Sequence, residues 1–161
     1  MVCTATVPFT NNPSPKEDGP EHLQRVAVDF RAVPGMEIRF DVEERSLVRV
    51  YGHIGFQLAG ANPGQCLSRS ERARDTLPER MMITLGLQLN KRWISSGSKI
   101  GSNPSRDDHY HVVSFAWSEV VDPGRYSVRL MARAVDVDRG KCRAYFKPGQ
   151  FSRMQVEVIE R

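Results

Sequence analysis

A short run of acidic and imidazole residues is the most ligand-like feature of the sequence. It reads Asp107-Asp108-His109-Tyr110-His111. Residues two apart on a strand point to the same side, so His109 and His111 could both reach one metal ion, with an aspartate completing its shell. Polar residues are also common where a strand begins, and a metal site needs a geometry that spacing alone does not provide. We therefore predict no bound metal here and expect surface or interface residues.

Motifs for catalysis and cofactor binding are missing from the sequence. It contains neither a Gly-x-Ser-x-Gly nucleophile motif nor a Gly-x-x-x-x-Gly-Lys phosphate loop. His53 could act as an acid or a base with His109 or His111, but nothing in their spacing favours this arrangement. The sequence therefore predicts no catalytic residue and no cofactor.

Aromatic residues are the other interface candidates, because they supply much of the binding energy where they are exposed. Tyr51 and Tyr110 lie on the more polar side of their alternating segments, whereas Trp117 alternates with apolar residues and is expected in the core. The complete set of expected interface residues is Phe9, Tyr51, Trp93, His109, Tyr110 and His111.

The elements that position these residues follow a period of two, which is typical of half-buried strands. Residues 33–35, Asn90-Lys91 and 122–124 have turn composition, and two glycines, Gly52 and Gly55, are expected to mark bends or a bulge in a long strand. No segment alternates strands with helices, which excludes a parallel α/β sheet. Strands are expected at 26–30, 36–42, 48–58, 81–89, 93–100, 109–118, 126–134, 142–146 and 150–159.

The first 22 residues show no periodicity and are rich in proline, asparagine, serine and acidic residues. We expect residues 1–22 to form an extended N-terminal arm, which could dock on a neighbouring surface near Phe9. Residues 23–161 then form one β domain. The predicted fold class is an all-β antiparallel sandwich with this arm.

Three segments resemble the jelly-roll domains of the C1q/TNF-like class. They are Asp122-Pro123-Gly124-Arg125-Tyr126-Ser127-Val128-Arg129-Leu130, the preceding residues 110–117 and the closing residues 151–159. The chain is also similar to small jelly-roll proteins of tailed bacteriophages. The resemblance implies a jelly roll that assembles as a homotrimer and binds proteins or glycans or forms part of a virion, and that is not an enzyme.

Composition and charge limit the possible partners. The 161 residues carry a formal charge of +4 and contain 40% hydrophobic residues, without the long apolar segment that a membrane span requires. The segment 60–106 carries most of the positive charge, but its basic residues are mixed with acids and lack an aromatic ladder, so nucleic acid is not an expected partner. Three cysteines without a C-x-x-C pair leave one disulfide open.

The first expectation for function is a non-enzymatic, oligomeric structural protein on a phage capsid or tail, whose arm contacts neighbouring virion proteins. No secretory signal is visible, so synthesis in the cytoplasm and, for a phage gene, location in the virion are expected. Two alternatives stay open. One is a carbohydrate- or receptor-binding module that exposes Trp93, Tyr51 or Tyr110, and the other is a small β-barrel cyclase that shapes a hydrophobic substrate.

Overall fold

The chain folds into two antiparallel sheets. The computed structural model describes residues 1–8, 24–60, 81–95, 99–102, 110–136 and 142–160. The strands are β1 (Val2–Thr6), β2 (Gln24–Arg25), β3 (Arg31–Val42), β4 (Ser46–Gly60), β5 (Met81–Leu89), β6 (Arg92–Ser95), β7 (Lys99–Ser102), β8 (Tyr110–Val121), β9 (Gly124–Asp136), β10 (Cys142–Lys147) and β11 (Arg153–Glu160). The single helical turn in these ranges, η1 (Gly149–Phe151), is far too short to span a membrane.

The strand pairs nest from the ends of the chain toward its middle. β1 pairs with β11, β3 with β9, β4 with β8 and β5 with β6, all antiparallel. One sheet, sheet A, contains β8, β4, β11, β10, β1 and β2, and the other, sheet B, contains β3, β9, β5, β6 and β7. A long hairpin rolled into two sheets gives this order. The chain is therefore an antiparallel jelly-roll sandwich, which confirms the predicted fold class.

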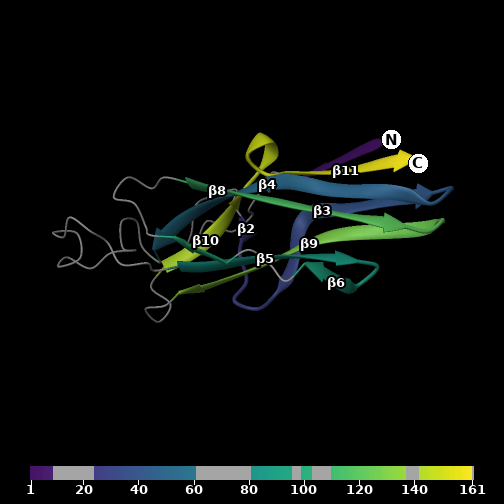
Figure 1. The fold of residues 1–161 in the computed structure, drawn as a ribbon. Helices are drawn as coiled ribbons and strands as arrows, with labels where there is room; N and C mark the ends of the chain where they lie inside the picture. Colours follow the sequence, from purple (N-terminus) through teal and green to yellow (C-terminus); the bar gives the residue numbers. More distant parts are fainter. Residues whose placement is uncertain (9–23, 61–80, 96–98, 103–109, 137–141, 161) are drawn as a thin grey trace.

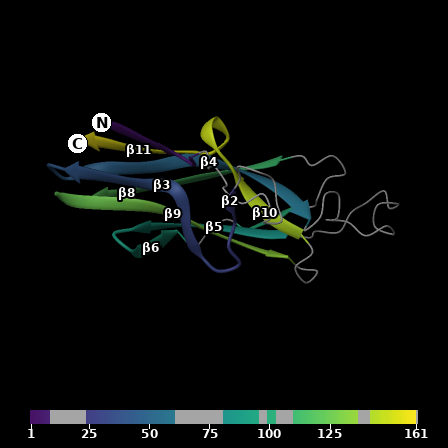
Figure 2. The same cartoon turned by 180° about the vertical axis from the view of Figure 1, so that it is seen from behind.

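The core lies between the two sheets, whose long strands run in roughly the same direction in both views (Figures 1 and 2). Alternate residues of each strand point inward, as the period of two predicts. β4 contributes Val48, Val50, Ile54 and Phe56, all with no exposed surface. At one side of the sandwich, Arg92 of β6 pairs with Glu119 of β8 at 3.9 Å and links the two sheets.

Two different strands share one side of β4. β11 pairs with residues 46–53 of β4, and β10 pairs with residues 55–60. The buried Ser152 lies between β10 and β11, where its hydroxyl accepts a hydrogen bond from the Gly55 N–H at 3.0 Å and donates one to the Lys147 carbonyl. Gly52 and Gly55 let the two strands approach β4 closely, so these glycines mark the change of partner.

The expected turn at 33–35 is instead a bulge inside β3. Ala32 and Glu37 pair with Met131 and Arg129, so five steps along β3 oppose two along β9. Gly35 has a left-handed backbone (φ 74°), and a Cβ there would lie 2.5 Å from the Thr6 carbonyl oxygen. Turn composition in this segment therefore produces a bulge that accommodates the N-terminal strand, and the chain does not reverse.

The expected strand at 26–30 is wrong, since regular pairing at this point is limited to β2. Residues 26–30 cross from sheet A to sheet B: the Val26 N–H donates to Ala144 in sheet A, and Ala27 accepts from Ala134 in sheet B, both at 2.8 Å. Val26 is buried, but Val28 is 57% exposed. The alternation of apolar residues in this segment therefore does not predict a strand with one buried face, because the chain crosses between the sheets here.

The first eight residues belong to the sandwich, which differs from the expectation of an arm over residues 1–22. β1 forms five register pairs with β11, from Val2 opposite Glu157 to Thr6 opposite Arg153. Val7 is 1% exposed and joins the core. β1 pairs with the edge of β11, which lies at the other end of the sequence, so local sequence patterns do not predict this pairing. Residues 9–23, the rest of the expected arm, lie outside the described residues.

We expect Gly52→Ala to destabilise the fold, because the added Cβ would overlap the Arg153 carbonyl oxygen and approach the Met154 Cα at 3.0 Å. Such overpacking against backbone costs about 1–3 kcal/mol or more of unfolding free energy. Urea unfolding followed by circular dichroism measures the change. Gly124→Ala is the matched control, because its Cβ would meet only the Tyr126 ring at 3.5 Å. Equal losses in both variants would contradict the role given to Gly52.

Candidate binding surfaces

The outer edge of β8 is a long, regular and almost uncharged strand edge. Its twelve residues pair without interruption with Ser46–Gln57 of β4, and within the described residues β8 pairs with no other strand. Glu119 is its only Asp, Glu, Lys or Arg residue, and it contains no proline. Natural edge strands are usually protected by lysine, proline or a bulge. The β8 edge lacks these protections and can accept another chain.

A shallow depression of about 270 Å³ adjoins this edge on the outer face of sheet A. Tyr51 forms one wall, and the small, exposed residues Ala116 and Ser118 of β8 form another. Arg49 also lines it and pairs with Glu157 at 3.8 Å. Phe115 and Trp117 of β8 point toward the core but stay half-exposed at the edge. This part of the surface is aromatic and nearly neutral.

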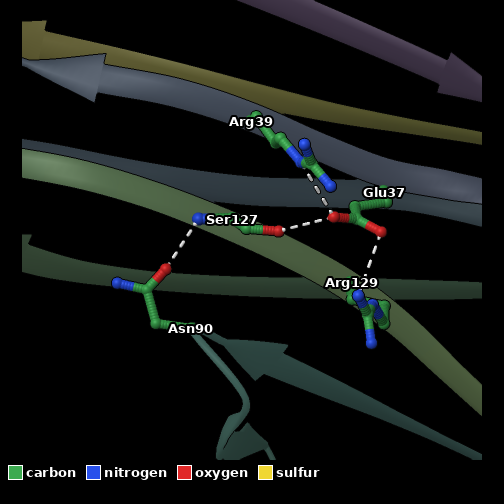
Figure 3. Close-up of polar contacts among 5 residues, drawn as sticks. All are labelled: Glu37, Arg39, Asn90, Ser127 and Arg129. Carbon is green, nitrogen blue, oxygen red and sulfur yellow. Dashed lines mark hydrogen bonds and ion pairs between the residues drawn. The ribbon is translucent and has the colours of Figure 1, made fainter.

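A polar cluster occupies the outer face of sheet B (Figure 3). The Glu37 carboxylate accepts hydrogen bonds from Ser127 Oγ at 3.0 Å, Arg39 Nε at 3.1 Å and Arg129 Nη2 at 3.1 Å. The Ser127 hydroxyl, followed by Arg39, lowers the pKa of Glu37 below its ordinary value. Glu37 therefore stays ionised at neutral pH and holds two guanidinium groups close together.

The turn between β5 and β6 completes this polar cluster. Asn90 and Lys91 have left-handed backbones (φ 48° and 68°), which are the angles of a two-residue type I′ hairpin and confirm the turn expected there. The Asn90 side chain accepts from the Ser127 N–H at 2.8 Å and donates to the Arg125 carbonyl at 3.2 Å. A depression of about 360 Å³ results, lined by Glu37, Arg39, Gln88, Asn90, Lys91, Ser127 and Arg129.

An aromatic pair lies on the same face of sheet B. Trp93 of β6 is 46% exposed and meets the Phe30 ring edge-on, with centroids 5.1 Å apart at 67°. The Arg133 guanidinium lies 4.8 Å from the centroid of the Phe30 ring. Within the described residues, the buried Nε of Arg133 has no hydrogen-bond partner. The Trp93 ring therefore packs against Phe30, while nearly half of the residue remains exposed to solvent.

The expected interface residues do not form one surface. Tyr51 lies on the outer face of sheet A and Trp93 on the outer face of sheet B. Tyr110 and His111 begin β8, where they pair with Gln57 and Phe56. Phe9 and His109 lie outside the described residues, as do Asp107 and Asp108. The interface role of each of these residues stays a prediction.

The remaining polar candidates have structural contacts. His53 Nε2 lies 3.0 Å from the Gln150 carbonyl oxygen and connects β4 to η1. Among the described residues, no three His, Cys, Asp or Glu side chains are close enough to hold a metal ion. Cys3 is a free thiol that packs against the core, and Cys66 lies outside the described ranges.

Sequence reasoning missed the cluster around Glu37. Its members come from three separate segments, and only the alternation of polar residues on 36–42 and 126–134 indicated that they face outward. The pair Asn90-Lys91 was a signal for a turn, but not for the contact of Asn90 with Ser127, 37 residues away.

The chain matches none of the protein-family models and none of the curated proteins with which it was compared. Among solved structures it is similar to Eiger TNF from S. frugiperda (14% identity, TM-score 0.43, 99% of this chain and 93% of that one). It is also similar to a family 35 carbohydrate binding module from an environmental isolate (12% identity, TM-score 0.36, 99% of this chain and 87% of that one). A third similar structure is the insecticidal delta-endotoxin Cry8Ea1 from Bacillus thuringiensis, with 10% identity and a TM-score of 0.47. That match covers 99% of this chain but only about a quarter (24%) of the endotoxin chain.

We expect Glu37 to stabilise the fold in a pH-dependent way. Its pKa is lowered in the folded state, so its contribution is present above the unfolded pKa and is lost as pH falls through the folded pKa. The Glu37 side chain is 31% exposed, which limits the contribution to about 1 kcal/mol or less. Urea unfolding should separate Glu37→Gln from the unmodified chain at pH 7, and the difference in unfolding free energy should be smaller at pH 3, which lies below the unfolded pKa.

Glu43→Gln is the control for this comparison, because Glu43 is an exposed residue of the hairpin between β3 and β4. Its free energy of unfolding should follow that of the unmodified chain at both pH values. A Glu37→Gln loss that is equal at pH 7 and pH 3 would show that the ionised carboxylate does not stabilise the cluster.

Proposed function

We propose that the protein is a non-enzymatic jelly-roll module that functions as a homo-oligomer through the β8 edge. The observation that carries the proposal is this edge: twelve regularly paired residues, a single charged side chain at Glu119, and no protecting proline or lysine. An exposed edge of this kind tends to associate with other chains unless an interface covers it. A stable assembly that buries the edge removes this hazard.

A second copy of the chain is the occupant that fits best. The edge carries two half-exposed aromatic residues, Phe115 and Trp117, and the adjoining face carries the depression beside Tyr51. Contact of one copy's edge with the next copy's face joins two different surfaces, and such heterologous contacts form a ring when the rotation between copies closes. The resemblance to C1q/TNF-like domains implies three copies in the ring. The nearly neutral β8 also lets copies with a net charge of +4 meet without like charges at the contact.

Two observations support a role without catalysis. Neither of the two depressions described above is lined by histidine or cysteine, which excludes a nucleophile–imidazole pair from their walls. The described space between the sheets is packed with buried apolar side chains, which does not favour the cyclase alternative. The narrower expectation, a phage capsid or tail accessory protein that contacts neighbouring virion proteins, stays a prediction.

Ala116→Lys should dissociate the oligomer. Ala116 is exposed on β8 opposite Tyr51, so a lysine there fills the depression and places a positive charge near Arg49. Light scattering coupled to size exclusion should give about three times the 18.2 kDa chain mass for the unmodified protein. The variant should show the monomer mass, or a dissociation constant raised at least about tenfold.

Ala32→Lys is the matched control, because Ala32 is an exposed alanine on β3 of the other sheet. It should keep the mass of the unmodified protein. The proposal is overturned if the unmodified protein is a monomer up to about 100 μM, a concentration at which specific interfaces with micromolar affinity are occupied. It is also overturned if both lysine variants dissociate equally.

A further inference from the structure

We propose that the outer face of sheet B binds an acidic saccharide, a sugar chain that carries carboxylate or sulfate groups. This inference is independent of the oligomer proposed above, because it concerns the opposite sheet. The site combines the polar depression beside Glu37 with the exposed Trp93. Three observations carry it: the order of side chains across the sheet, the balance of charge around the depression, and the support behind the Trp93 ring.

The strand register places recognition groups in one row across the sheet. Glu37 of β3 pairs with Arg129 of β9, Arg129 with Gln88 of β5, and Gln88 with Trp93 of β6. Neighbouring strands lie about 4.8 Å apart, so the row spans about 14 Å. It offers an arginine, an amide and an indole in sequence. These groups can pair with an anion, hydrogen bond to hydroxyls and pack against the apolar face of a sugar ring.

The charge around the depression favours an anion. Arg39, Lys91 and Arg129 line it against a single carboxylate, that of Glu37. The Glu37 oxygens already accept three hydrogen bonds, so this carboxylate positions the two arginines, and within the described residues their other N–H groups stay available to a ligand. Lys91 is exposed at the tip of the turn and has no ion-pair partner in the described part of the chain. Guanidinium groups bind carboxylate and sulfate oxygens in a defined geometry.

The Trp93 ring is a preorganised stacking surface. Phe30 contacts it edge-on at 5.1 Å, and Phe30 is in turn covered by the Arg133 guanidinium at 4.8 Å. A ring held in place in this way loses little conformational entropy when it binds a ligand. Since 46% of Trp93 is exposed, a pyranose ring can pack its C–H groups on the aromatic face.

A saccharide fits this surface better than a nucleic acid. Proteins that bind single strands stack successive bases on several aromatic rings along a continuous basic groove. In its described part, the outer face of sheet B has one exposed indole, that of Trp93, and its cations gather around one depression and not along a groove.

The test uses isothermal titration of the full chain with defined probes. They are tri-galacturonate, its neutral methyl ester, a sulfated disaccharide and a thymidine decanucleotide. We expect binding of tri-galacturonate or the sulfated disaccharide, and at least about tenfold weaker binding of the ester and the oligonucleotide. No binding of either acidic sugar at millimolar concentration overturns the proposal, and so does equal affinity for the ester or the oligonucleotide.

Variants locate the binding on the proposed face. Trp93→Ala and Lys91→Glu should each weaken binding of the acidic sugar at least about tenfold, because they remove the stacking surface and one cation. Arg153→Glu is the control: it makes the same reversal from cation to anion on an exposed residue of β11, in sheet A. Equal loss in Lys91→Glu and Arg153→Glu would show nonspecific attraction and overturn the site. Ala116→Lys should retain binding, so failure of the oligomer and failure of this site are distinguishable.

Discussion

β4 must bond three strands at once, and the layout of sheet A depends on how it does so. β8 occupies the whole of one side, whereas β11 and β10 divide the other between residues 46–53 and 55–60. The chain between β10 and β11 has to fold back over β4 where they meet. Gly52 and Gly55 provide the space, and the Ser152 hydroxyl satisfies the Gly55 N–H in a buried setting. An unpaired polar group there would cost about 1–3 kcal/mol.

The opposite side of β4 is regular along its whole pairing with β8. All irregularity is confined to the β10–β11 side, so β8 keeps one continuous register along its entire length. A continuous register leaves a continuous outer edge, since neither a bulge nor a turn interrupts it. The regular edge that makes β8 a candidate interface thus occurs beside glycines and a serine that accommodate the change of partner on the other side of β4.

The sequence allowed the strands and the turn Asn90-Lys91 to be predicted, because alternation and turn composition are local properties. It did not allow the crossing segment, the bulge or the position of the first residues to be predicted. Val26 and Val28 alternate like strand residues, and only the hydrogen bonds of Val26 with sheet A and of Ala27 with sheet B show that the chain crosses between the sheets. Gly35 resembles a turn residue, yet its left-handed backbone accommodates Thr6, which is remote in sequence. Such features depend on pairings between distant segments, which composition does not encode.

The surface beside Tyr51 on sheet A and the surface beside Glu37 on sheet B differ in charge because strand pairing brings different residues together on each. Along the sequence the positive charge concentrates in residues 60–106, but the described basic face combines Lys91 with Arg39 and Arg129, which lie outside that segment. Pairing of β3, β9 and β5 brings these cations together, whereas pairing of β4 with β8 places small neutral residues beside Tyr51. A neutral surface suits close packing between identical copies, and a basic one suits an anionic ligand. Since the surfaces lie on opposite sheets, one protein can assemble and bind without competition between them.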